Sequence, residues 1–393
     1  MNTVLGLFKK FKWKYYGNYA VIGIIGVIFT LLTLVGTPKQ STLFLLEDII
    51  IKTILAVSLS LVVGFLGELS LGHAGFMCIG AYFGGLVAVY LEAYGIVKGN
   101  GVLSFVLALV VGALISGAFG FVIGLPALRL KGDYLGIVTL AFCEIVKTIF
   151  ENLTFKVPKN GVFDQVGGAT GIKTPRFNKE YLFIIGFLLL LVTLAVIQNL
   201  IRSKHGRAIT AIRDNEIAAH ATGINVTKYK LVGFVVSSIF AGAAGVFYSF
   251  ANSTVSASVF DYNYSIEILV IVVIGGMGNI NGAIISAALI TFLDTKLATV
   301  LTGDLAVLQD IIYALILILV VVYKNAPSLK FFREKYNLRK MMRAIAIKIK
   351  GDRGYADDDD AWHRIPTKIE MNEVLSTDII VNESVKRPDK EDK

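Results

Sequence analysis

The segment KHGRAITAIRDNEIAAHATG (residues 204–223) is a charged insert between two long apolar runs. Tyr181–Leu200 precedes the insert, and Tyr229–Phe250 follows it. A charged segment between two membrane spans cannot lie in hydrocarbon, so it must lie in water or at the lipid headgroups. The insert therefore predicts a loop, residues 201–228, that connects two transmembrane helices.

The same segment has the periodicity of a short amphipathic helix. Several apolar residues fall on one face of a 3.6-residue period, and a run of polar residues interrupts that face. Gly223 is a natural end for such a helix. We expect a surface helix of this kind to provide a docking surface for a soluble partner. The apolar face comprises Ile209, Ile212, Ile217, Ala218 and Ala221, and the interruption comprises Arg213, Asp214, Asn215 and Glu216.

Composition indicates a membrane protein. The chain has 393 residues, of which 55% are hydrophobic and 17% are charged, and its long apolar runs would have no water-shielding partner in a soluble protein. The net charge is +9, but the basic residues cluster beside the apolar runs. That pattern follows the positive-inside rule and argues against nucleic-acid binding. We predict an all-α, polytopic integral membrane protein with about ten transmembrane helices, or eight if a glycine-rich segment is re-entrant.

The order of apolar and basic segments predicts three regions. Residues 1–18 form a basic cytoplasmic N-terminus, and residues 19–324 form the transmembrane domain. Residues 325–393 form a cytoplasmic tail, basic and then acidic, that is partly disordered and whose basic part faces anionic lipid. An even number of spans puts both termini in the cytoplasm. Four basic flanks then lie on the cytoplasmic side: Lys9–Lys14, Arg129–Lys131, Arg202–Arg213 and Lys324–Lys350.

Two glycine-rich segments interrupt the apolar runs: GFLGELSLGHAGF (residues 64–76) and GGMGNING (residues 275–282). Irregular backbone at membrane depth is tolerated where protein covers it or where it lines a cavity, and its exposed groups can bind a zwitterionic solute. A tight turn between closely packed spans is an equal alternative for the first segment. The candidate substrate-pathway residues are Gly67, Glu68, Ser70, Gly72, His73, Gly75, Gly275, Gly276 and Gly278.

Small residues recur at helical spacing in several predicted spans. Gly80 and Gly84 are four apart, as are Gly120 and Gly124, and Gly242–Gly245 is a run of small residues. Such residues let transmembrane helices approach closely, so we expect helix contacts there.

The remaining polar residues favour structural roles. Glu144 and Lys147, three apart in the predicted span Tyr134–Phe150, are expected to pair, although an intramembrane glutamate is also a functional candidate. The two cysteines, Cys78 and Cys143, lie in apolar runs and are expected to be buried. The four histidines lack metal-ligand spacing, and no nucleophile–base constellation is evident. We predict neither a metal site nor a catalytic site.

Residues 206–226 resemble the cytoplasmic loop of branched-chain amino-acid ABC transporter permeases of the LivM type. The resemblance rests on Gly206–Ala208, Ala211–Ala219 and Gly223–Val226. In that family the loop resembles the coupling helix of ABC importers, with the pattern Glu-Ala-Ala, three residues, then Gly. Ala218, Ala219 and Gly223 keep this spacing, whereas Ile217 stands where the pattern has Glu.

Other segments resemble the same family. Residues 67–74 are similar to its Gly-Gln-Leu-Ser-Leu-Gly-His-Ala motif, with Glu68 in place of Gln. Gly275–Gly278 matches its Gly-Gly-Met-Gly motif. The turn-rich stretch Glu151–Glu180 is similar to the family's glycine-rich external loop and is either a docking face for a binding protein or a simple loop.

The resemblance implies a permease subunit of an ABC importer for leucine, isoleucine and valine in a bacterial or archaeal cytoplasmic membrane. The implied partners are a second, related permease subunit in a heterodimer, two ATPase subunits, an external substrate-binding protein and lipid. The chain has no Gly-x-x-x-x-Gly-Lys-Ser/Thr loop. We therefore expect no catalysis and no cofactor on this chain, with ATP and Mg²⁺ bound by the partner ATPase. The ATPase-coupling residues would be Arg207, Arg213, Asp214, Asn215, Glu216, Ala219 and Gly223.

Other functions remain open on the sequence. Related importers carry urea, other small amides or other amino acids. An ion-gradient-driven secondary transporter would need ionisable residues within spans, and a membrane scaffold would need no transport residues at all. The specificity of the loop at residues 206–226 argues against the last two. The ionisable candidates for ion coupling are Glu68, Glu144, Lys147, Glu267, Asp294 and Lys296.

Overall fold

The computed structural model describes residues 40–95, 101–130, 133–159, 162–174, 179–252 and 254–300, together with residues 314, 315 and 318. These residues all belong to one compact unit, Met1–Asn325. The predicted first span, Tyr19–Val35, and both terminal segments lie outside the described residues. The predicted last span, Leu305–Tyr323, lies outside them except for three isolated positions.

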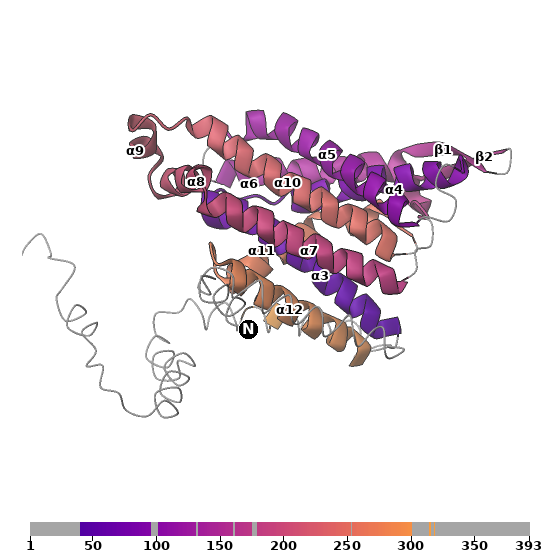
Figure 1. The fold of residues 1–393 in the computed structure, drawn as a ribbon. Helices are drawn as coiled ribbons and strands as arrows, with labels where there is room; N and C mark the ends of the chain where they lie inside the picture. The colour runs from indigo at the N-terminus through magenta and orange to yellow at the C-terminus, as the bar shows by residue number, and fades with distance from the viewer. Residues whose placement is uncertain are drawn as a thin grey trace, which may run out of the picture. The chain divides into compact units, whose positions relative to one another are not determined.

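The described residues are mostly helical (Figure 1). The first half contains α3 (Gln40–Ser60), the π-helix η1 (Leu61–Leu66), α4 (His73–Ala93), α5 (Gly101–Ala127), α6 (Asp133–Asn152), β1 (Thr154–Lys159), β2 (Val162–Gly167) and the 3₁₀-helix η2 (Gly168–Thr170). The second half contains α7 (Lys179–Arg202), α8 (Lys204–Asp214), α9 (Glu216–Ala221), α10 (Val226–Ala251), the 3₁₀-helix η3 (Ala257–Val259), α11 (Tyr262–Gly275) and α12 (Ile280–Val300).

Within the described residues, six helices are long and apolar enough to cross a membrane. They are α3 with η1, α4, α5, α7, α10 and α12. The shorter α11 is also apolar. The predicted span Tyr134–Phe150 forms α6, which is not one of the six. Helix α6 carries Glu144, Lys147 and Glu151, which reduce its apolar character.

The expectation of an all-α chain is wrong at one place. Strands β1 and β2 form an antiparallel hairpin in which Thr154 pairs with Gly167 and Lys159 pairs with Val162. The Tyr90 hydroxyl near the end of α4 donates a hydrogen bond to the Lys156 carbonyl at 2.7 Å. The hairpin therefore covers the C-terminal end of α4, the end opposite to the glycine-rich segment that precedes this helix.

Small residues allow α10 to pack closely against α4 and α5, as the sequence predicts. A Cβ atom added to Gly80 of α4 would overlap the Gly242 carbonyl of α10, and one added to Gly245 would overlap the Met77 carbonyl. A Cβ atom on Gly120 of α5 would overlap the Ser238 hydroxyl. These three contacts place α10 against two helices with no room for side chains.

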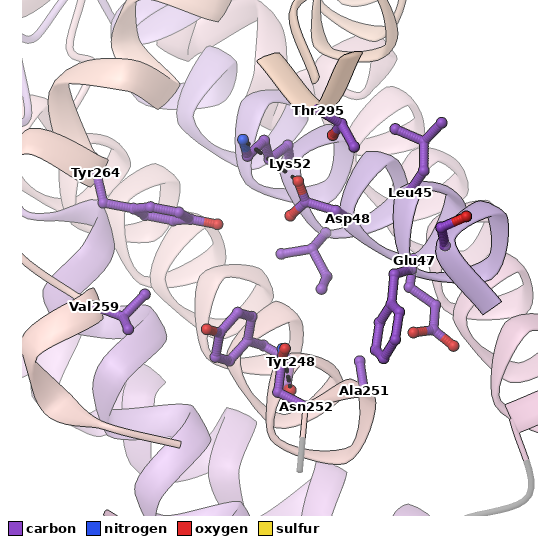
Figure 2. Close-up of a pocket in the computed structure, with 13 residues that line it drawn as sticks. Leu45, Glu47, Asp48, Lys52, Tyr248, Ala251, Asn252, Val259, Tyr264 and Thr295 are labelled. Atoms are coloured by element: carbon purple, nitrogen blue, oxygen red, sulfur yellow. Dashed lines mark hydrogen bonds and ion pairs between the residues drawn. The ribbon is translucent and has the colours of Figure 1, made fainter. Parts of the chain in front are cut away.

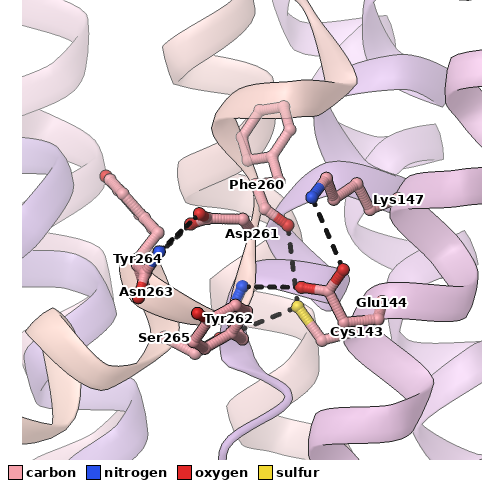
Figure 3. A network of polar contacts seen from close by, with 9 residues as sticks. All are labelled: Cys143, Glu144, Lys147, Phe260, Asp261, Tyr262, Asn263, Tyr264 and Ser265. Carbon is pink, nitrogen blue, oxygen red and sulfur yellow. Dashed lines mark hydrogen bonds and ion pairs between the residues drawn. The ribbon is translucent and has the colours of Figure 1, made fainter.

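Glu144 and Lys147 pair as expected, with Lys147 Nζ 3.4 Å from Glu144 Oε2. The second carboxylate oxygen of Glu144 accepts a hydrogen bond from the Tyr262 backbone amide at 2.9 Å (Figure 3). Next to this pair, the thiol of Cys143 donates to the Phe260 carbonyl at 3.6 Å. These contacts fix the start of α11 against α6. Cys78 is buried, as is Cys143.

The close packing of α10 can be tested with a matched pair of substitutions. Gly245→Ala would push a methyl group into the α4 backbone, whereas Gly233→Ala on the same helix meets its nearest atom, Ile209 Cδ1, at 3.8 Å. Overpacking costs about 1–3 kcal/mol, so we expect Gly245→Ala to lower the thermal unfolding midpoint in detergent. We expect Gly233→Ala to leave it unchanged or raise it slightly, because alanine favours helix. Equal midpoints for the two variants would contradict the packing described here.

Candidate functional site

The coupling segment, residues 201–228, contains two helices and the start of a third, each with its own N-cap. The Ser203 hydroxyl accepts from the amides of His205 and Gly206 at 3.1 and 3.3 Å and begins α8. The Asn215 side chain accepts from the Ala218 amide at 3.0 Å and begins α9. The Asn225 side chain accepts from the Lys228 amide at 3.1 Å and begins α10. Local sequence therefore sets each helix start.

The prediction of one continuous helix over the segment is wrong. Asn215 has an extended backbone (φ −160°, ψ 105°), which ends α8 and starts α9 in a new direction. Ile209 and Ile212 of α8 are buried, as expected for an apolar face. Ile217 of α9 is 83% exposed instead, because the break at Asn215 turns it away from α8. Gly223 follows α9 with φ +84°, which agrees with its predicted role as a helix stop.

Arg213, at the end of α8, contacts both glycine-rich segments. Within these segments, the non-helical backbone is limited to residues 67–72, between η1 and α4, and to residues 276–279, between α11 and α12. We call these two stretches the first break and the second break. Arg213 Nη1 donates to the Gly64 carbonyl at 3.0 Å, just before the first break. A Cβ atom on Gly67 would come within 2.7 Å of Arg213 Cγ, and one on Gly278 would come within 3.6 Å of Arg213 Nη1. One guanidinium thus lies where the two breaks meet.

The end of η1, directly before the first break, also touches the second break. A Cβ atom on Gly64 would overlap the Gly278 amide nitrogen. Gly64 belongs to the π-helix η1, and π-helical turns frequently occur at functional sites. Gly67, Gly276 and Gly278 have φ values of +81°, +98° and +78°, which glycine adopts without strain.

An ion triad forms a second link between the coupling segment and the first break. Lys230 Nζ lies 2.6 Å from Glu68 Oε1 and 3.2 Å from Glu216 Oε2. The lysine side chain is 5% exposed and belongs to α10, whereas Glu216 begins α9. The Lys230–Glu68 pair is the buried part of the triad, whereas the Glu216 side chain, which joins α9 to it, is 43% exposed and adds a weaker contact that solvent screens.

The rest of the first break and the start of α4 are packed against protein. The Leu71 amide donates to the Thr139 hydroxyl of α6 at 2.9 Å, and the Ala74 amide donates to the Ser265 hydroxyl of α11 at 3.0 Å. The His73 ring lies 2.8 Å from the Ser58 hydroxyl. Neighbouring helices therefore cover the irregular backbone. Such cover is required for non-helical backbone at membrane depth that does not line a cavity.

The predicted site residues fall into two groups. Five of them meet at one junction: Arg213 and Glu216 from the coupling set, with Gly67, Glu68 and Gly278 from the pathway set. The others lie elsewhere and have separate roles. Ser70, Gly72, His73 and Gly75 are buried between helices, Gly275 packs against Gly282 and Ala283, and Gly276 shapes the second break. In the coupling segment, Arg207 contacts the Arg202 carbonyl, Asp214 pairs with Arg213, Asn215 caps α9, Ala219 is buried and Gly223 follows α9.

Sequence reasoning missed two members of the junction. Lys230 is separated from its partner Glu68 by 162 positions, and nothing local distinguishes it from the neighbouring Lys228. Gly64 was seen only as the first residue of a glycine-rich stretch. A pocket of about 200 Å³ lies beside the junction and is lined by Gly278, Asn279, Phe65 and Arg202, among others. Within the described part of the chain, no group of three metal-ligating side chains is gathered at this junction or elsewhere.

The fold and the junction define a class: a multi-pass helical membrane protein with a surface segment tied to breaks inside its helical core. Comparison with known proteins gives the family. Residues 41–321 match the family described as the branched-chain amino acid transport system permease component, and the chain belongs to it.

Two relatives are named high-affinity branched-chain amino acid transport system permease protein LivM. The one from Salmonella typhimurium is 37% identical over 61% of this chain and 60% of its own length. The one from Escherichia coli K12 is 34% identical over 68% of this chain and 65% of its own length. The chain thus aligns with less than two thirds of either relative. The ribose import permease protein RbsC of E. coli K12 is 26% identical over 78% of this chain and 92% of its own length. No solved structure matches.

The ion triad can be tested by removing its charges singly and together. Lys230→Met leaves Glu68 and Glu216 without their shared cation, and loss of one partner from a buried pair costs about 3–5 kcal/mol. We expect this variant to unfold at a lower temperature in detergent. Combining it with Glu68→Gln removes the stranded charge and should restore most of the loss. Strictly additive losses in the double variant would contradict a direct Glu68–Lys230 interaction.

Proposed function

We propose that this chain is the permease subunit of an ABC importer for the branched-chain amino acids leucine, isoleucine and valine. The observation that carries the proposal is the junction of Arg213 with both glycine breaks. It connects a surface segment that a soluble ATPase can reach to the irregular backbone inside the helical core. Family membership and the two LivM relatives support the choice of solute.

The proposed setting is a bacterial or archaeal cytoplasmic membrane, with the coupling segment and both termini in the cytoplasm. Lys204, Arg207 and Lys228 on the segment support this orientation, since cytoplasmic loops are enriched in basic residues. The full chain would have eight to ten spans. It would pair with a second, related permease subunit, two ATPase subunits and an external binding protein.

In the proposed mechanism, ATP binding and hydrolysis on the partner subunits move α8 and α9. ATP and Mg²⁺ stay on those subunits, so this chain only transmits motion. Arg213 carries the displacement to both breaks, and the Glu68–Lys230–Glu216 triad carries it to the first break and to α10. Since glycine at φ > 0 adopts alternative backbone geometries at low cost, the breaks are the places where the helices can reorient.

The decisive test of this function is uptake of labelled leucine by cells that contain this chain and its partner subunits. The matched control carries an ATPase whose phosphate-loop lysine is replaced. We expect uptake in the first strain, none in the control, and little effect of a protonophore while ATP is maintained.

Uptake that follows the ion gradient and survives loss of the ATPase lysine would contradict the proposal and favour a secondary transporter. ATP-dependent uptake of urea or another small amide, without leucine uptake, would keep the ABC permease and overturn the choice of solute. Ribose belongs in the same panel, because a relative is named a ribose import permease.

Ile217 provides a test of ATPase docking. Its side chain is 83% exposed on α9 beside Glu216, and an exposed apolar side chain on a polar surface favours contact with a partner protein. We expect Ile217→Asp to lower co-purification of the ATPase at least tenfold while the protein still inserts in the membrane. Ile217→Leu should retain binding. Equal ATPase recovery with the aspartate variant would contradict docking on α9.

A further inference from the structure

A pocket of about 520 Å³ lies near the start of α3, far along this helix from the glycine breaks (Figure 2). Residues from α3, α10, α11 and α12 line it, with Val259 of η3. Its volume is within the range of about 300–1,000 Å³ that is usual for small-molecule sites. In the proposed orientation the pocket faces the outside of the cell.

The ammonium group of Lys52 and the carboxylate of Asp48 line the polar side of the pocket, and two carboxylates outside the lining, Glu267 and Asp294, also approach Lys52. Lys52 Nζ lies 2.8 Å from Glu267 Oε1, 3.4 Å from Asp48 Oδ2 and 3.8 Å from Asp294 Oδ2. The lysine side chain is 6% exposed, so these charges interact at reduced dielectric. Lys52 and Asp48 thus present one group of each sign to the pocket, which is complementary to a zwitterion.

Tyr264 supplies an independent indication of a ligand. Its hydroxyl oxygen is buried and has no hydrogen-bond partner among the described residues. Figure 2 shows this hydroxyl directed from α11 into the pocket, on the side of Lys52 and Asp48. Since buried polar atoms are nearly always hydrogen-bonded, the hydroxyl marks a place for an acceptor of a bound molecule.

The other side of the pocket is apolar. Phe44, Leu45 and Ile51 of α3 line it with Ala251 of α10 and Val259. An aliphatic side chain buried there would be stabilised by the removal of its surface from water. The pocket therefore combines a place for an ammonium group, a donor for an acceptor group and a surface for an aliphatic chain.

We propose that this pocket binds the zwitterion of an aliphatic α-amino acid. Its ammonium group lies at Asp48, its carboxylate accepts from the Tyr264 hydroxyl and the Lys52 ammonium, and its side chain packs against Phe44 and Val259. The proposal rests on the proposed function and extends it, because it gives the permease a solute site of its own besides that of the external binding protein.

The test measures occupancy of the pocket by protection of a thiol from an impermeant reagent. Val259→Cys places the thiol at the pocket, at a position that is 40% exposed. Ser258→Cys, at the neighbouring exposed residue that does not line the pocket, is the matched control. The native cysteines, Cys78 and Cys143, are buried, so labelling of the unsubstituted chain measures the background. Both variants are studied in the full transporter complex in lipid nanodiscs, and leucine uptake by the same complexes is measured in vesicles.

We expect leucine to slow labelling of Val259→Cys and to leave labelling of Ser258→Cys unchanged. Isoamylamine, which lacks the carboxylate, and 4-methylpentanoate, which lacks the ammonium group, should each protect only at concentrations roughly tenfold higher or more. Adding Tyr264→Phe to the Val259→Cys variant should raise the half-protecting leucine concentration roughly tenfold, because one hydrogen bond to a charged group is lost.

Each outcome is decisive. Uptake of leucine without protection at Val259→Cys overturns the pocket and leaves the proposed function intact. Protection without uptake supports the pocket and overturns the proposed solute of the transporter. Protection by isoamylamine or by Na⁺ at least as strong as that by leucine overturns the zwitterion in favour of a cation site. Equal protection at Val259→Cys and Ser258→Cys shows an effect on the whole loop and also overturns the pocket.

Discussion

The contact of the Arg213 guanidinium with the Gly64 carbonyl is the interaction on which the functional architecture depends. It is available because Gly64, Gly67 and Gly278 have no side chains that would exclude the arginine or separate the two breaks. The Lys230 triad adds a second link at the same end of the molecule. With two links to the helical core, α8 and α9 are not a loosely attached loop, so force applied to them reaches the breaks.

Two helices connect this junction with the pocket at the other end of the molecule. Helix α3 extends from Asp48 and Lys52 at the pocket into η1, which contains Gly64 at the junction. Helix α11 extends from Tyr264 at the pocket to Gly275, directly before the second break. The Lys52–Glu267 ion pair joins the same two helices near the pocket. Under the proposed function, a movement at the breaks would change the relative position of the groups that hold the solute, and these two helices would connect ATP-driven motion with solute affinity.

Sequence reasoning succeeded where the signal is local. The small-residue spacings of Gly80 and Gly242 predicted helix contacts, and the i, i+3 spacing of Glu144 and Lys147 predicted their pairing. It failed where partners are far apart in the chain, as for Lys52 and Glu267, which are separated by 215 positions. Two errors were avoidable. The single helix expected over residues 204–223 overlooked Asn215, a good N-cap that signals a new helix. The loop expected over Glu151–Glu180 overlooked Asn160-Gly161, a strong hairpin signal. The sequence alone placed the residues of the candidate site in two separate sets, Arg213 and Glu216 as coupling residues and the glycines as pathway residues. Only the tertiary structure brings the two sets together.

The central claim is that the coupling segment and the glycine breaks move as one body. The most direct measurement is the distance between spin labels at Thr222, after α9, and Met277, in the second break, both of which are exposed. The complex would be compared without nucleotide and with ATP bound to a hydrolysis-deficient ATPase, and a second label pair, Thr222 with Leu289 of α12, would report reorientation beyond the break. The account predicts an unchanged distribution between Thr222 and Met277 and a shifted one between Thr222 and Leu289. A shift between Thr222 and Met277 would show that the segment slides against the breaks and would contradict the account.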